Sequence, residues 1–180
     1  MITKKTIFII PGFRQRPSQK AYQKLAKMLK KEKYHPILVK IPWNATTVAE
    51  NTEFFLKAYK KIVRKKKYIL GFSYGAMIAF HASTKVRTSG IILCSLSPYF
   101  KEDNPASLLC CAELAKKIKT KQIHLLYGTR ETKSLIRRTT FAFAKIVSKS
   151  KRLTPVRKTE HNIGDKNYLY QIHQISRGLH

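Results

Sequence analysis

Short runs of β-branched and aliphatic residues alternate with longer amphipathic segments along the entire chain. The short runs predict six strands, at residues 6–10, 36–41, 68–70, 90–95, 123–127 and 153–157. The longer segments predict helices at residues 18–33, 46–64, 74–86, 105–119, 132–149 and 165–176. Strands that alternate with helices are typical of βα units, which build a mostly parallel sheet. The pattern therefore predicts an α/β fold.

Right-handed crossovers would place the helices on both faces of this sheet, as a three-layer α/β/α sandwich with about six strands. Pro155 lies within the last apolar run, and we expect that strand at an edge because proline lacks the N–H that a central strand donates. Ligands of such sheets bind outside the carboxyl ends of the strands. A catalytic residue is therefore expected just after a strand.

The length of 180 residues and the hydrophobic content of 43% suit one domain with a substantial core. We expect residues 1–180 to form that single domain. The apolar run at residues 7–10 is too short for a signal peptide, and no stretch reaches membrane-spanning length. The three cysteines, Cys94, Cys110 and Cys111, lack the spacing of a zinc site or a disulfide framework. These features predict a soluble, cytoplasmic protein.

Lysine and arginine number 37 against nine acidic residues, which gives a formal net charge of +28. The basic residues are spread over every segment, and most fall near predicted helix ends, where cations complement the helix dipole. This distribution predicts nonspecific, salt-sensitive binding to nucleic acid or anionic membranes. The sequence contains no arginine-rich motif and no known nucleic-acid-reading module, so we expect no specific nucleic-acid partner.

The pentapeptide Gly71-Phe72-Ser73-Tyr74-Gly75 lies between a predicted strand and a predicted helix. A sharp turn between a strand and a helix exposes a serine as a nucleophile, and the strained backbone leaves no room for side chains two residues away. Gly71 and Gly75 meet that steric requirement. Ser73 is therefore the candidate nucleophile, and the alternative is an ordinary glycine-flanked turn.

On this motif and its flanking elements, the chain resembles the α/β-hydrolase superfamily, as a small member without a lid that is similar to serine esterases and lipases. The resemblance implies an acid after a later strand and a histidine after the last strand. Residues 128–131 look like the family's turn before the acid, so Glu131 is the expected acid, with Asp103 or its neighbour Glu102 as the second choice. Of the six histidines, only His161 lies in a loop just after a predicted strand, the last one, so it is the expected catalytic histidine.

The resemblance also implies two backbone N–H groups that stabilise an oxyanion. One belongs to Tyr74, directly after the candidate nucleophile, and the other to Phe13, in the turn after the first strand. Aromatic residues near predicted strand ends are candidates for an apolar substrate pocket, with plain packing as the alternative, namely Trp43, Tyr99 and Phe100. The implied mechanism needs no metal and no organic cofactor.

These residues together predict a serine hydrolase, most simply a carboxylesterase, that cleaves small or short-acyl carboxylic esters through an acyl-enzyme intermediate. The expected partner is a small-molecule ester. A thioesterase, lactonase, peptidase or acyltransferase would use the same residues, because a fold does not fix a substrate. Two hypotheses of another class stay open: a basic, nucleic-acid-associated protein on a hydrolase scaffold, and a noncatalytic ligand-binding protein.

Overall fold

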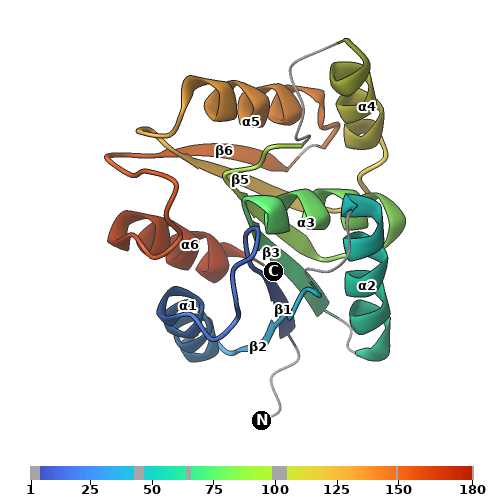
Figure 1. The fold of residues 1–180 in the computed structure, drawn as a ribbon. Coiled ribbons are helices and arrows are strands. Elements are labelled where there is room, and N and C mark those ends of the chain that lie inside the picture. Colours follow the sequence, from blue (N-terminus) through green and yellow to red (C-terminus); the bar gives the residue numbers. More distant parts are fainter. Residues whose placement is uncertain (1–4, 43–46, 64–65, 99–104, 149, 180) are drawn as a thin grey trace.

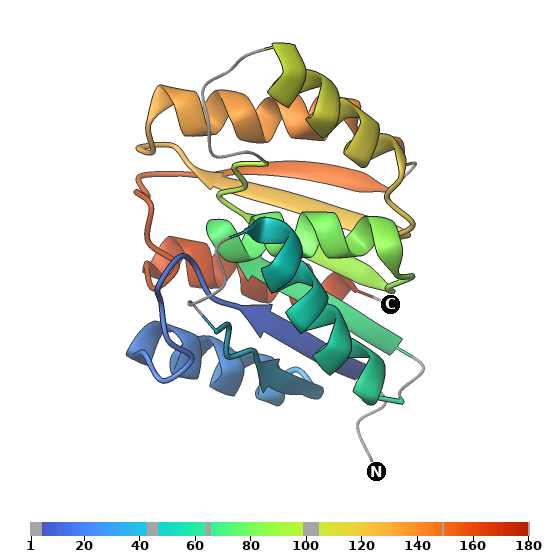
Figure 2. The same cartoon turned by 45° about the vertical axis from the view of Figure 1, so that its right-hand side comes forward.

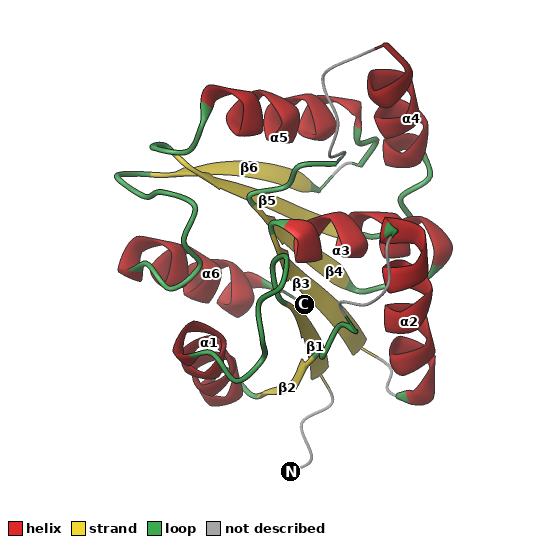
Figure 3. Cartoon of the chain, viewed as in Figure 1, coloured by secondary structure: helices red, strands yellow, loops and turns green. Residues whose placement is uncertain are grey.

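A six-stranded parallel sheet forms the centre of the molecule (Figures 1 and 3). The computed structural model describes residues 5–42, 47–63, 66–98, 105–148 and 150–179. The strands are β1 (Lys5–Ile10), β2 (Tyr34–Leu38), β3 (Lys66–Phe72), β4 (Gly90–Cys94), β5 (Gln122–Gly128) and β6 (Lys151–Val156). Their order across the sheet is β2-β1-β3-β4-β5-β6, and every neighbouring pair is parallel. The carboxyl ends of all six strands therefore lie along the same side of the sheet.

Helices cover both faces of the sheet, which confirms the predicted three-layer sandwich (Figures 1 and 2). One face carries α1 (Lys20–Lys31) and α6 (Lys166–Gly178). The other face carries α2 (Val48–Lys61), α3 (Tyr74–Lys85), α4 (Pro105–Lys116) and α5 (Lys133–Lys145). Each face has its own cluster of buried apolar side chains, so the sheet is enclosed on both sides.

The predicted element boundaries agree with the structure to within a few residues. The predicted edge position of the strand that contains Pro155 is confirmed, because β6 is the last strand in the order of the described sheet, beside β5. The second strand begins earlier than predicted, at Tyr34. Lys33 adopts a positive φ of 62°, which turns the chain from the end of α1 directly into the strand. Only a turn of two residues, Glu32 and Lys33, therefore separates the two elements.

The central helix α3 is buried on nearly all sides. Its side chains Met77, Ile78 and Phe80 have almost no exposed surface, since α2 and α4 flank the helix and β3 and β4 lie beneath it. The helix begins at Tyr74, and a single residue, Ser73, separates it from the end of β3. Within the described ranges, we find no helix that is both long enough and apolar enough to cross a membrane.

Candidate active site

Ser73 is the single residue between β3 and α3, and its backbone is strained. Its φ is 55° and its ψ is −116°, a conformation that residues other than glycine rarely adopt. The N–H of Ser73 donates a hydrogen bond of 2.8 Å to the carbonyl of Cys94, which ties the turn to the end of β4. The predicted sharp turn between strand and helix is therefore present at this residue.

The two glycines of the pentapeptide lie where a side chain would not fit. A Cβ atom on Gly71 would lie 2.2 Å from the carbonyl oxygen of Gly75, one helical turn further on. A Cβ atom on Gly75 would lie 2.1 Å from the carbonyl oxygen of Ile10 and 2.5 Å from that of Pro11. Gly75 thus lets the start of α3 approach the end of β1.

The structure brings Ser73, His161 and Glu131 together from three different loops. The Nε2 atom of His161 lies 2.9 Å from the Oγ of Ser73, and its Nδ1 lies 3.3 Å from the Oε1 of Glu131. An ionised carboxylate only accepts hydrogen bonds, so Nδ1 carries the proton and Nε2 accepts from the serine hydroxyl. The three side chains form a continuous line from carboxylate to hydroxyl.

The loop between β6 and α6 holds His161 at the edge of the sheet. Thr159 accepts a hydrogen bond from Arg130 N–H through its carbonyl, and the same carbonyl lies 2.2 Å from the position of a Cβ on Gly128. Asp165 accepts from Asn167 N–H at 2.7 Å and caps the amino end of α6. These contacts fix the histidine loop against the loop that carries Glu131.

The ring of His161 packs against Phe72, the residue before the candidate nucleophile. The two ring centroids are 4.8 Å apart, with 35° between the ring planes. The side chain of His161 still exposes 43% of its surface, whereas that of Glu131 is fully buried. The line of groups therefore begins inside the protein and ends at solvent, where a substrate has access.

The buried carboxylate has two further supports that the sequence analysis did not identify, Ser95 and Tyr168. The Oγ of Ser95 donates to the Oε1 of Glu131. Because the single hydroxyl proton of Ser95 is used there, the hydroxyl of Tyr168, 2.6 Å away, donates to Ser95. Burial, with the nearby Cys94 and Glu131, raises the pKa of Tyr168 well above its ordinary value, so it remains a donor.

Ser95 could have been found from the sequence, but Tyr168 could not. Ser95 follows β4 directly, at the edge where functional residues are expected. It also has a positive φ of 54°, which is strained for a serine. Tyr168 lies in the final helix, and only the three-dimensional packing brings its hydroxyl to Ser95.

The loop after β1 lies beside the start of α3, where the two oxyanion donors are expected. The ring centroids of Phe13 and Tyr74 are 5.7 Å apart. Gly12 N–H donates to the hydroxyl of Tyr22 and to the Oε1 of Gln15, each at 3.0 Å, which holds the loop in place. The two predicted donor residues are therefore neighbours, and Tyr74 directly follows Ser73.

A pocket of about 430 Å³ opens beside the candidate nucleophile. Besides Ser73 and His161, its lining residues come from the beginning of α5 and the turn before it, namely Thr132, Ser134, Leu135 and Arg138. The predicted pocket residues Trp43, Tyr99 and Phe100, and the second-choice acids Glu102 and Asp103, lie outside the described residues. The described lining therefore neither includes nor tests the predicted aromatic residues.

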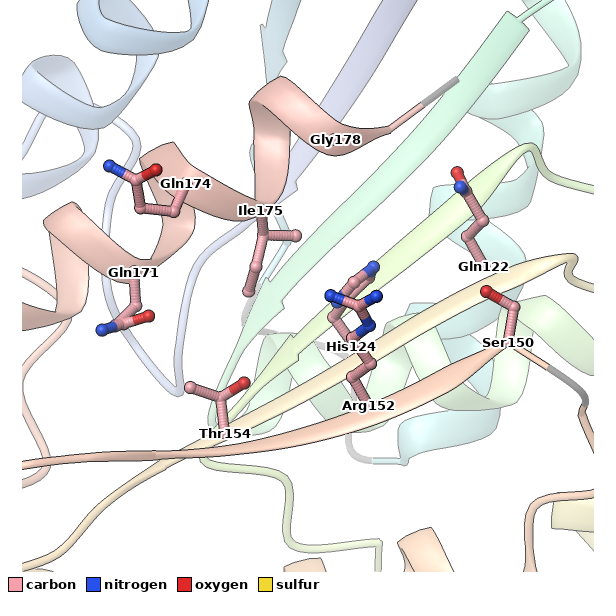
Figure 4. Close-up of a pocket in the computed structure, with 9 residues that line it drawn as sticks. All are labelled: Gln122, His124, Ser150, Arg152, Thr154, Gln171, Gln174, Ile175 and Gly178. Atoms are coloured by element: carbon pink, nitrogen blue, oxygen red, sulfur yellow. The ribbon is translucent and has the colours of Figure 1, made fainter.

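A separate pocket of about 340 Å³ lies near the opposite ends of the last two strands (Figure 4). Its lining residues come from β5, β6 and α6, and include His124 and Arg152, which are neighbours across the two strands. Burial, and then the charge of Arg152, lower the pKa of His124 from 6.5 to about 4. His124 lies near the start of its strand, and is not part of the group around Ser73.

Comparison with known proteins rests on structure alone, since neither a sequence family nor a curated protein sequence matches the chain. Three solved structures superpose on almost all of it. Est1E from Butyrivibrio proteoclasticus with bound ferulic acid has a TM-score of 0.75 at 11% identity, covering 97% of this chain and 87% of that one. Mouse alpha/beta hydrolase domain-containing protein 10 has a TM-score of 0.77 at 12% identity, covering 97% and 88%. The monoacylglycerol lipase of Paleococcus ferrophilus also has a TM-score of 0.77 at 12% identity, covering 98% and 94%.

The chain has an α/β-hydrolase fold. Within this α/β-hydrolase fold, Ser73 occupies the turn between a central strand and the helix that follows it. Glu131 and His161 follow β5 and β6, the two strands at one end of the sheet. The order serine, acid, histidine along the chain is the order that the resemblance implied.

Proposed function

We propose that the chain is a serine hydrolase that cleaves carboxylic esters through an acyl-enzyme intermediate. The observation that carries this proposal is the line of hydrogen bonds from buried Glu131 through His161 to Ser73, whose hydroxyl stands on a strained turn. A packing role would not require a serine in a strained conformation beside a half-exposed histidine. A nucleophile with its base requires both.

In the proposed acylation step, Ser73 Oγ attacks the ester carbonyl while His161 Nε2 takes the hydroxyl proton. Glu131 accepts the hydrogen bond from Nδ1, holds this tautomer and stabilises the imidazolium that forms. The bond between the carbonyl carbon and the alkoxy oxygen then breaks, and His161 gives its proton to the leaving alcohol. The acyl group remains on Ser73.

Backbone N–H groups of Phe13 and Tyr74 are the proposed donors to the oxyanion of the tetrahedral intermediate. Support comes from the position of Tyr74 at the first turn of α3, where N–H groups point out of the helix end, and from the loop of Phe13 beside it. In the deacylation step, a water molecule gives a proton to His161 Nε2 and attacks the acyl carbonyl. The bond between the acyl carbon and Ser73 Oγ then breaks, His161 returns the proton to Oγ, and the carboxylic acid leaves.

Small or short-acyl esters are the proposed substrates. Of the described residues that line the pocket beside Ser73, Leu135 alone is a large apolar side chain, and it is only partly buried. The remaining lining groups are hydroxyls, the imidazole and the Arg138 guanidinium. Such a wall offers a long acyl chain little apolar surface to bury, so it favours compact substrates.

A cytoplasmic location completes the proposal. Its support is the state of the cysteines, since Cys94, Cys110 and Cys111 are all free thiols and two of them are buried.

Hydrolysis of nitrophenyl esters of increasing acyl length, measured beside acyl-thioesters, lactones and peptides, tests the proposal. We expect the short-acyl oxygen esters to be the best substrates. The variants Ser73→Ala and His161→Ala should each lose about 10³-fold or more in kcat, because the nucleophile and its base act as a unit.

Ser134→Ala is the matched control, because it removes a hydroxyl from the same pocket that is not part of the hydrogen-bonded line. Its kcat should stay within about threefold of the original. If Ser73→Ala cleaves the esters as fast as Ser134→Ala does, Ser73 is not the nucleophile. Faster turnover of thioesters, lactones or peptides than of oxygen esters would reassign the reaction to that class.

A further inference from the structure

The amino ends of the strands, at the opposite end of the sheet from the candidate active site, are strongly basic. Lysines occupy the starts of several strands, with Lys5 on β1, Lys66 on β3 and Lys151 on β6, while Lys121 directly precedes β5. Lys5 and Lys66 are neighbours across the β1–β3 pair. The pKa of Lys5 is lowered by burial first and then by the charge of Lys66. Positive charges thus lie close together at the amino ends of the strands.

A pocket of about 460 Å³ lies at this end of the sheet, among the amino ends of β3, β4 and β5. Cations from three separate segments surround it, namely Lys66 and Lys67 from β3, Arg87 from the loop before β4, and Lys119 and Lys121 from the loop before β5. Tyr59, Thr88 and Ser89 complete the described lining. Its volume is within the range of about 300–1,000 Å³ that is typical of small-molecule sites.

One of the five cations is already bound by the protein itself. The Nζ of Lys67 donates to the carbonyls of Tyr59 and Ile62, at 3.3 and 3.1 Å, and lies 4.1 Å from the centroid of the Tyr59 ring. Burial lowers the pKa of Lys67. Lys67 therefore stabilises the end of α2, and the other four cations are the ones that can bind a ligand.

Those four cations, Lys66, Arg87, Lys119 and Lys121, form no ion pair among the residues that the structure describes. All four are exposed, and no described carboxylate lines the pocket. The acids nearest to it along the chain are used elsewhere, since Glu53 pairs with Lys85 and Glu113 with Lys116. The like charges therefore repel one another without internal compensation, and a bound anion would relieve that repulsion.

We propose that this pocket binds the phosphate groups of a small molecule that carries a diphosphate or triphosphate. Lysine and arginine are the side chains that proteins use for phosphate oxygens. Four uncompensated cations exceed the charge of one carboxylate or one phosphate, and match a condensed phosphate. The concave shape and the convergence of three segments favour a compact ligand over an extended chain.

The proposed phosphate site and the candidate active site are separate. The strand β3 runs from Lys66 at the pocket to Phe72 beside Ser73, and seven residues of parallel strand span roughly 20 Å. Occupation of the basic pocket therefore does not block the nucleophile. The site also accounts for part of the +28 charge, which the proposed hydrolase reaction leaves unexplained.

Calorimetric titration of the full chain with sodium tripolyphosphate, at 50 mM and 300 mM salt, tests the proposal. We expect one strong site whose affinity falls as salt rises, and weaker binding of orthophosphate. The double variant Lys119→Gln/Lys121→Gln should bind tripolyphosphate about tenfold more weakly. Its ester hydrolysis should be unchanged, and its unfolding temperature without phosphate should not fall, because repulsion is reduced.

Lys24→Gln/Lys27→Gln is the matched control, since both lysines are exposed on α1 and the change in net charge is the same. It should change tripolyphosphate affinity by less than about twofold. Equal weakening by both double variants would overturn the proposal, because net charge alone would then explain the binding. So would tight binding of a 20-nucleotide RNA that tripolyphosphate does not displace, because the surface would then be a nucleic-acid site.

Discussion

Ser95 connects the candidate acid to the rest of the protein. Its hydroxyl donates to Glu131 and accepts from Tyr168, so the carboxylate is positioned by a strand end and by the final helix together. The second carboxylate oxygen, Oε2, is buried without a hydrogen-bond partner among the described residues. Glu131 therefore depends on His161 and Ser95, and the loss of either donor is expected to be costly.

Two replacements of Ser95 distinguish the effect of this hydrogen bond on activity from the effect of backbone strain on stability. Ser95→Ala and Ser95→Gly both remove the donor to Glu131, and we expect kcat for ester hydrolysis to fall on the order of tenfold in each. Glycine tolerates the φ of 54° and alanine does not, so the glycine variant should be more stable by about 1 kcal/mol. Steady-state kinetics and denaturant unfolding measure the two effects. Unchanged kcat in both variants would remove Ser95 from the account.

At the scale of elements, the site depends on how closely α3 approaches β1. The carbonyls of Ile10 and Pro11 occupy the space that a side chain on Gly75 would need. This contact fixes the start of α3, and with it Tyr74, relative to the loop that carries Phe13. A displacement of the helix would separate the two proposed oxyanion donors.

Gly75→Ala should therefore reduce both stability and activity. We expect the free energy of unfolding to fall by about 1–3 kcal/mol, because the added methyl group overlaps main-chain atoms that have no room to move. Gly178→Ala is the control, since no described atom lies within 4 Å of the position of its Cβ apart from its chain neighbours and the backbone of its own helix. That variant should be neutral or more stable by up to about 1 kcal/mol. Equal stability of the two variants in urea would contradict the close contact.

Local patterns in the sequence predict the elements and most of the site. The alternation of strands and helices, and the glycines around Ser73, follow from rules that act over a few residues, and the structure agrees with them. Tyr168 depends on packing between segments 73 residues apart, which no local pattern encodes. The part that α5 takes in the pocket beside Ser73 was not predicted for the same reason, because the start of this helix approaches Ser73 only in the folded chain.

At the scale of the whole molecule, the carboxyl and amino ends of the strands carry different functional groups. The carboxyl ends hold the group around Ser73, and the amino ends hold uncompensated cations. His124 and Arg152 form a further pair toward the amino ends of β5 and β6, without a described carboxylate in their pocket (Figure 4). The Nδ1 of His124 is buried and has no hydrogen-bond partner among the described residues.

The depressed pKa of His124 predicts that the protein loses stability in mild acid. In the unfolded chain the imidazole takes up a proton near its ordinary pKa of 6.5, but in the folded protein only near a pKa of about 4. The unfolded state therefore binds more protons between these values, and the free energy of unfolding should fall by up to about 3 kcal/mol as pH drops from 6.5 to 4. Urea unfolding of His124→Gln should lack this part of the pH dependence. Parallel curves for both proteins would contradict the prediction.

The central claim is that Ser73 is a nucleophile activated by His161. Covalent labelling with a fluorophosphonate, located by peptide mass spectrometry, tests this claim most directly, because the reagent needs an activated serine but no knowledge of the substrate. We expect a single phosphonylated residue, Ser73, and labelling slowed by at least about 100-fold in His161→Ala. A folded protein that stays unlabelled, or that is labelled equally fast without His161, would contradict it.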